Sequence, residues 1–185
     1  MVIFDKTGTL TRGSPAVSGV AAAVGTTEED LMARAAAVES NSEHPLAKAI
    51  VATARRRGLT RLAATNFEAL PGRGAKALVE GTSIEIGGPR LVTEARVTVP
   101  PEVEKLTAAW TSDGKTVLYV LAQGRLLGAF GVEDEIRPES SEAVAELHRL
   151  GVRVAMITGD PVIHRVAPDA RNATTSPTSS GLPHF

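Results

Sequence analysis

The sequence contains no cysteine, which excludes disulfide bonds, zinc–thiolate sites and catalysis by a thiol. It has no apolar run near the ~18 residues that a membrane-spanning helix needs. The formal net charge of −1 argues against a general nucleic-acid or membrane-surface binder. No charged segment followed by an apolar one precedes the first predicted strand, as a secretory signal would require. We therefore expect this chain, by itself, to be soluble and cytoplasmic, with no nucleic-acid partner and no membrane span.

The beginning of the sequence places a carboxylate at the end of an apolar strand. Met1–Phe4 predict a short buried strand, and Asp5 follows it, ahead of a loop rich in threonine and glycine. In open α/β sheets this end of the strands is where ligands bind. A carboxylate beside small hydroxyl residues suits nucleophilic attack on a phosphoryl group, and the alternative is an aspartate that caps a turn.

The region 15–124 has a mixed pattern of helices and short strands. Thr26 and Glu29 have capping-box spacing ahead of "DLMARAAAVES", which predicts a helix. Pro45 can begin a second helix, "PLAKAIVATARRR", and Gly58 can end it. The segments after it are β-like, with intervening glycines that predict hairpins. We therefore predict an antiparallel sheet with helices packed on it.

The last part of the sequence returns to the pattern of its beginning. Residues 138–150 predict a helix with Gly151 as its C-cap, and "VRVAMI" predicts a buried strand that ends in Thr158, Gly159 and Asp160. This strand and the first one are expected to be parallel neighbours in one sheet, with the mixed region inserted between them. Residues 161–185 have no helical or strand periodicity, and we expect a disordered tail.

Four motifs carry a resemblance to a known family. The string "DKTGTLT" from Asp5 resembles the phosphorylation motif of the P-type ATPases, ion pumps of the haloacid dehalogenase superfamily, and "TGD" at 158–160 resembles a second motif of that family. "SEHP" at 42–45 and "PGRGA" at 71–75 resemble motifs of the heavy-metal-transporting pumps.

The resemblance implies an α/β fold in which an α+β nucleotide-binding domain is inserted into a partial haloacid dehalogenase-like, Rossmann-like parallel sheet. It assigns 1–14 and 125–160 to a partial phosphorylation domain and 15–124 to the nucleotide-binding domain, with antiparallel strands and helices.

The resemblance also implies catalytic residues. Asp5 resembles the carboxylate that attacks the γ-phosphate of ATP, with Lys6 and Thr7 next to it in the motif. Mg²⁺ would neutralise the opposing negative charges, and Asp5 and the main-chain carbonyl of Thr7 would bind it. Thr158 resembles the hydroxyl that holds the phosphoryl oxygens, and Asp160 lies where a contact to Mg²⁺ or nucleotide is expected. Superfamily phosphatases have an aspartate where this chain has Thr7, which favours a pump over a phosphatase.

Four residues of the inserted region are implied in nucleotide binding. His44 resembles the histidine that packs on or bonds to the adenine, and Glu39 matches the glutamate on the adenine side. Gly72 and Gly74 resemble a loop where the missing side chains let the backbone approach the nucleotide. A histidine before proline can also be only a helix cap, and a Gly-x-Gly only a turn.

The sequence departs from the family at two points. Gly88 stands where heavy-metal pumps usually have an asparagine, so ATP binding is expected to be weaker. No lysine occurs after Lys115, and a Gly-Asp-Gly-x-Asn-Asp loop is absent from the sequence. We therefore expect a truncated region, inactive in transport by itself, whose partners in a full-length pump are the membrane and actuator domains.

Three interpretations of function remain open at this point. The first is the cytoplasmic ATP-binding and phosphorylation region of a heavy-metal pump, with copper favoured over zinc or cadmium on the segment "EDEIRPES" at 133–140 alone. The second is a fragment that binds ATP without catalysis. The third is a stand-alone haloacid dehalogenase-like phosphatase. Whether this chain by itself is an enzyme stays open.

Overall fold

The computed structural model describes residues 1–5, 9–157 and 163–165 and divides the chain into two compact units. One unit comprises Met1–Gly13 with Ile136–Phe185, and the other comprises Ser14–Glu135. The fold is α/β, as predicted: a sheet with a parallel strand pair in the first unit, and an antiparallel sheet with helices in the second. In the part of the chain that the structure describes, no helix is long and apolar enough to cross a membrane.

The 14–135 unit is built on a large antiparallel sheet. In the described residues this sheet has six strands in the order β2-β7-β6-β5-β4-β3. Neighbouring strands from β3 to β7 pair antiparallel. The strands are β2 Thr11–Ala22, β3 Ala64–Leu70, β4 Gly74–Val79, β5 Thr82–Gly87, β6 Thr116–Ala122 and β7 Arg125–Ile136.

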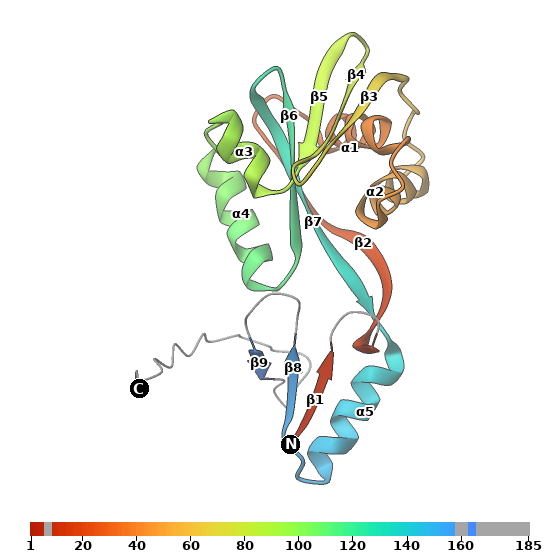
Figure 1. The fold of residues 1–185 in the computed structure, drawn as a ribbon, viewed down its shortest axis with the longest axis vertical. Coiled ribbons are helices and arrows are strands. Elements are labelled where there is room, and N and C mark those ends of the chain that lie inside the picture. The colour runs from red at the N-terminus through yellow and green to blue at the C-terminus, as the bar shows by residue number, and fades with distance from the viewer. Residues whose placement is uncertain (6–8, 158–162, 166–185) are drawn as a thin grey trace. The chain divides into compact units, whose positions relative to one another are not determined.

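Four helices cover the two faces of this sheet in the described part of the unit (Figure 1). Helices α1 (Glu28–Glu39) and α2 (Pro45–Arg56) pack on one face, and α3 (Pro89–Ala95) and α4 (Pro101–Ser112) pack on the other. Each of the last three begins with proline, which is pre-organised for a first helical turn. Helix α1 is capped by Thr27, whose hydroxyl accepts a hydrogen bond from the Asp30 N–H at 3.1 Å.

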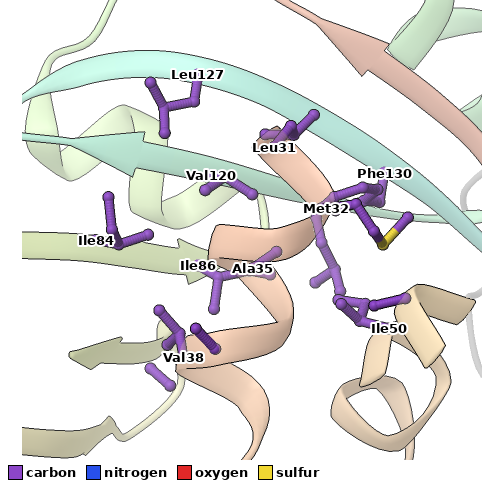
Figure 2. Close-up of a cluster of buried hydrophobic side chains, with 14 of the residues drawn as sticks. Leu31, Met32, Ala35, Val38, Ile50, Ile84, Ile86, Val120, Leu127 and Phe130 are labelled. Carbon is purple, nitrogen blue, oxygen red and sulfur yellow. The ribbon is translucent and has the colours of Figure 1, made fainter. Parts of the chain in front are cut away.

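The largest core lies between α1, α2 and the sheet. Figure 2 shows Leu31, Met32, Ala35 and Val38 of α1 facing side chains of the strands, and these residues are fully buried. Counted from Leu31 they occupy positions i, i+1, i+4 and i+7, which puts one apolar stripe of the helix on the sheet. The other residues of this core that Figure 2 labels are Ile50, Ile84, Ile86, Val120, Leu127 and Phe130. Each large side chain buried this way contributes about 1.5–3 kcal/mol.

The smaller unit contains the predicted parallel strand pair. Strands β1 (Val2–Asp5) and β8 (Val154–Ile157) pair in parallel register, from Val2 opposite Val154 to Asp5 opposite Ile157. Helix α5 (Pro138–Arg149) precedes β8 and packs on it, so the expected helix–strand order is confirmed.

A further short strand lies inside the segment that we predicted to be a disordered tail. Strand β9 (Ile163–Arg165) pairs antiparallel with β8. The other residues of 161–185 lie outside the described part of the chain.

The boundary between the units differs from the predicted one. We placed 125–160 with the phosphorylation domain, but β7 pairs with β6 from Arg125 to Val132, so 125–135 belong to the larger unit. The long strand β2 is the other neighbour of β7 in this sheet. The chain thus passes between the two units twice, both times within neighbouring strands.

Candidate functional site

The turn between α1 and α2 joins two of the predicted nucleotide residues. Helix α1 ends at Glu39, and the Ser42 N–H donates to the Glu39 carbonyl at 3.0 Å. The Ser42 hydroxyl in turn accepts a hydrogen bond from the His44 N–H at 3.3 Å. Ser42 therefore connects the helix that ends at Glu39 to the one that follows His44.

His44 is the N-cap of α2 and is exposed. Its Nδ1 accepts a hydrogen bond from the Leu46 N–H at 3.2 Å, and Pro45 occupies the first helical position. An imidazole that accepts at Nδ1 carries its proton on Nε2 when it is neutral. The ring therefore presents an N–H donor and an aromatic face to solvent. The cap that we weighed as an alternative is present, and it fixes the orientation of the ring.

Glu39 is a buried carboxyl group at the end of a helix. It is 8% exposed, and among the described residues no ion pair includes it. Burial raises the pKa of Glu39 to about 7, and hydrogen bonding from the Ser42 side chain opposes part of that rise. A carboxyl group of this kind exchanges its proton near neutral pH, so it can donate a hydrogen bond as well as accept one. Groups with such perturbed pKa values gather at functional sites.

Gly72 lies in the turn between β3 and β4, and Gly74 is the first residue of β4. Both have positive φ, +68° and +136°. The Arg73 N–H between them donates to the Leu70 carbonyl at 2.9 Å. Gly72 is exposed, and a Cβ there would meet only the Arg90 Nη1, at 3.7 Å.

Gly74 has a structural role of its own. A Cβ on Gly74 would overlap the Ile86 carbonyl oxygen and lie 2.7 Å from the Gly87 Cα. A Cβ on Gly87 would overlap the Arg73 carbonyl oxygen in the same way. Gly74 and Gly87 are register partners, so two glycines allow the strands β4 and β5 to approach. Gly74 is thus needed for the contact between two strands, and its predicted role beside the nucleotide stays a prediction.

Sequence reasoning missed three charged residues beside this turn. Arg73 Nη1 lies 3.3 Å from Glu94 Oε2, and Arg90 Nε lies 2.6 Å from Glu94 Oε1. The i, i+4 spacing of Arg90 and Glu94 was the signal available in the sequence.

The predicted catalytic residues are only partly described. Asp5 is exposed at the carboxyl end of β1, opposite Ile157, the last residue of β8. The two strands therefore end at the same edge of their sheet, where ligands bind in α/β folds. Lys6, Thr7, Thr158 and Asp160 lie outside the described residues.

The structure therefore groups the predicted site residues into three places. Glu39 and His44 lie on either side of the α1–α2 turn, Gly72 and Gly74 lie on either side of Arg73 at the β3–β4 turn, and Asp5 lies in the other unit. Helix α1 packs on β3, β4 and β5, so the first two places belong to one folded body.

Comparison with known proteins identifies the family. Residues 1–176 match the haloacid dehalogenase-like hydrolases. The copper-transporting P-type ATPase of Rhizobium leguminosarum bv. viciae is 39% identical over 159 residues, which cover 86% of this chain and 19% of that protein. The zinc-transporting ATPase of Bacillus subtilis (strain 168) is 37% identical over 161 residues, covering 86% and 25%. The chain thus spans about a fifth to a quarter of the length of these relatives.

Solved structures agree with this assignment. A zinc-transporting PIB-type ATPase in the E2·Pi state has a TM-score of 0.74 and 36% identity, over 86% of this chain and 26% of that chain. The catalytic domain of the CPx-ATPase CopB-B, in a structure that describes its conformational changes upon nucleotide binding, has a TM-score of 0.61 and 26% identity, over 86% and 52%. The N-domain of HMA6, a copper-transporting P-type ATPase, has a TM-score of 0.52 and 31% identity, over 66% and 99%.

The strand-end aspartate, the inserted antiparallel domain and these similarities agree with one another. The chain belongs to the haloacid dehalogenase-like hydrolases and, among them, to the heavy-metal-transporting P-type ATPases.

Proposed function

We propose that the 14–135 unit binds ATP and that Asp5 accepts its γ-phosphoryl group, as part of a copper-transporting pump. The observation that carries the nucleotide assignment is the Glu39–Ser42–His44 turn, which has a buried carboxyl with a pKa near 7 before it and an oriented, exposed imidazole after it. Two similarities support it: the N-domain of HMA6 aligns over 99% of its length, and CopB-B changes conformation upon nucleotide binding. Copper is favoured because the R. leguminosarum relative transports copper.

The adenine base would be recognised at the α1–α2 turn. The His44 ring would stack on the base or donate from Nε2, since its Nδ1 is occupied by the Leu46 N–H. Glu39 would meet the polar edge of the base with a carboxyl that donates or accepts. The exposed turn at Gly72 would lie against the rest of the nucleotide.

The chemistry assigned to Asp5 is a phosphoryl transfer. A carboxylate oxygen forms a bond to the γ-phosphorus, the bond from that phosphorus to the β–γ bridging oxygen breaks, and ADP leaves with the electron pair. Asp5 fits this role because its carboxylate is exposed at the strand end. Mg²⁺, for which Asp5 and the Thr7 carbonyl are suitable oxygen donors, would supply positive charge against the repulsion between carboxylate and phosphate. In a full-length pump this region would lie on the cytoplasmic side, with the membrane and actuator domains as partners.

Replacing His44 by alanine is expected to weaken ATP binding by about 1–2 kcal/mol, the loss of one hydrogen bond with its stacking area. The measurement is a titration of the 185-residue chain with ATP, without Mg²⁺, followed by NMR. If no resonances around His44 shift at millimolar ATP, the nucleotide assignment is wrong.

Two further variants separate binding from folding. His44→Asn keeps an N-cap acceptor for α2, so we expect the urea midpoint to stay close to that of the parent chain while ATP binding weakens. Glu43→Gln, an exposed neighbour paired with Lys48, is the matched control and should leave ATP binding unchanged.

The 185-residue polypeptide by itself is expected to form no stable aspartyl phosphate with radiolabelled ATP and Mg²⁺. Phosphoryl transfer depends on cationic neutralisation of the moving charge, and the sequence offers no lysine after Lys115 for it. The readout is the label that survives an acid quench and is released by hydroxylamine. Such a label, present in the parent chain and lost in Asp5→Asn, would contradict this prediction and show that the chain phosphorylates itself.

A further inference from the structure

Three charged side chains form a cluster beside the β3–β4 turn. Glu94 accepts from Arg73 through Oε2 at 3.3 Å and from Arg90 through Oε1 at 2.6 Å. Arg73 belongs to the turn itself, between Gly72 and Gly74, and the other two residues lie on α3. We call these three residues the arginine cluster.

The backbone brings the cluster together. Gly87 lies directly against the Arg73 carbonyl, and Gly88, the next residue, is the N-cap of α3. The close approach of β4 and β5 therefore places the start of α3 beside the turn. Gly72 has no side chain, and this leaves room for Arg90. A Cβ on Gly72 would lie 3.7 Å from the Arg90 Nη1, its nearest heavy atom.

The charges of the cluster do not cancel. Two guanidinium groups share one carboxylate, so the cluster carries one excess positive charge next to the proposed nucleotide turn. The side chains of Arg73 and Arg90 are 41% and 68% exposed, and that of Glu94 is 37% exposed. Exposed ion pairs are weak because water screens them, so another anion can replace the carboxylate. Guanidinium groups present paired N–H donors that match the oxygens of a phosphate.

We propose that Arg73 and Arg90 bind the phosphate groups of the nucleotide and that Glu94 competes with those phosphates for both guanidinium groups. The proposal rests on the nucleotide-binding function proposed above and adds how the phosphate part is recognised. Without nucleotide, Glu94 holds the two side chains in place. With nucleotide, phosphate oxygens replace the Glu94 carboxylate, and the carboxylate turns to solvent.

The test compares ATP with adenosine, which has the base but no phosphate, on the 185-residue chain at low salt. We expect Arg73→Gln and Arg90→Gln each to weaken ATP binding about tenfold, which is 1.4 kcal/mol, and to leave adenosine binding within about twofold. Glu94→Gln should strengthen ATP binding about threefold, again without effect on adenosine, because it removes the competing anion. Arg90→Lys keeps the charge but not the paired donors, so its ATP affinity should fall less than that of Arg90→Gln.

Matched controls come from other surface charges of the same sheet. Glu80→Gln removes an exposed carboxylate, paired with Arg34, at the turn between β4 and β5, away from Gly74. Arg125→Gln removes an exposed arginine at the turn between β6 and β7. Both controls should leave the ratio of ATP to adenosine affinity unchanged, and all variants should show the far-UV circular dichroism of the parent chain.

The outcomes separate this inference from the proposed function. If ATP and adenosine both bind but the arginine variants leave their ratio unchanged, the phosphate assignment is overturned while nucleotide binding stands. If Arg125→Gln lowers the ratio of ATP to adenosine affinity as much as the Arg73 and Arg90 variants do, the effect comes only from net charge. The phosphate assignment is then also overturned. If neither ligand binds the parent chain, the proposed function itself fails, and this inference fails with it.

Discussion

At pH 8 the substitution Glu39→Gln is expected to raise the free energy of unfolding of the 14–135 unit by about 3 kcal/mol, and at pH 5 by less than about 1 kcal/mol. Burial raises the pKa of Glu39 from 4.5 to about 7. Each pKa unit between the folded and unfolded states is worth about 1.36 kcal/mol. Glutamine has the same shape, accepts from Ser42 and carries no charge to bury, so it avoids this cost.

The direction of this pH dependence follows from the protonation state of Glu39 that the folded state prefers. The folded state favours the protonated carboxyl, so its contribution is complete below pH 4.5 and is lost as the pH rises through about 7. The measurement is urea unfolding at the two pH values, followed by the fluorescence of Trp110, the one tryptophan of the sequence. Trp110 packs close to Gly131 within the same unit, so it reports on this unfolding.

Glu43→Gln is the control for this experiment. Glu43 lies in the same turn but is exposed, and the hydrogen bond from Lys48 lowers its pKa. Its replacement should give no gain that grows with pH. An equal gain at pH 5 and pH 8 for Glu39→Gln would show that the buried charge is not the cause.

Local patterns in the sequence predicted the elements that depend on local physics. The apolar spacing in α1 and the proline that begins α2 were sufficient for both helices, because one apolar stripe has to meet the sheet. The cap of α1 was misplaced by one residue: the hydroxyl that caps is that of Thr27, not Thr26. Two adjacent threonines offer the same chemistry, and only tertiary packing selects between them. The parallel pairing of β1 with β8 followed from two apolar runs that each end in a polar loop.

Features that depend on residues far apart in the sequence could not be predicted. The predicted boundary at 124 separates two paired strands, because β7 continues the sheet through its pairing with β6. The burial of Glu39 was also hidden, since a charged residue at a helix end is usually exposed. The Arg73–Glu94 contact joins a turn to a helix and has no periodic signal. Each of these depends on a partner that only the folded sheet brings near.

The contact between Gly74 and β5 is another feature that depends on residues far apart in the sequence. Replacing Gly74 is expected to have a large effect on stability. Gly74→Ala is expected to lower the free energy of unfolding of the 14–135 unit by about 3–4 kcal/mol. Its φ of +136° disfavours any side chain, and a Cβ would overlap the Ile86 carbonyl oxygen of the neighbouring strand. Gly87→Ala is expected to act similarly, because its Cβ would overlap the Arg73 carbonyl oxygen. Both should be measured as shifts of the urea midpoint by Trp110 fluorescence.

Gly88→Ala is the matched control, one residue further along the chain. Gly88 has a φ of −72°, and no heavy atom lies within 4 Å of the position its Cβ would take. Alanine there should cost less than about 1 kcal/mol, the price of a poorer N-cap for α3. The contrast between positions 87 and 88 then isolates strand contact from the general effect of removing a glycine. If Gly74→Ala weakened ATP binding but left the urea midpoint unchanged, the strand contact would be the wrong explanation, and the glycine would be required by the nucleotide instead.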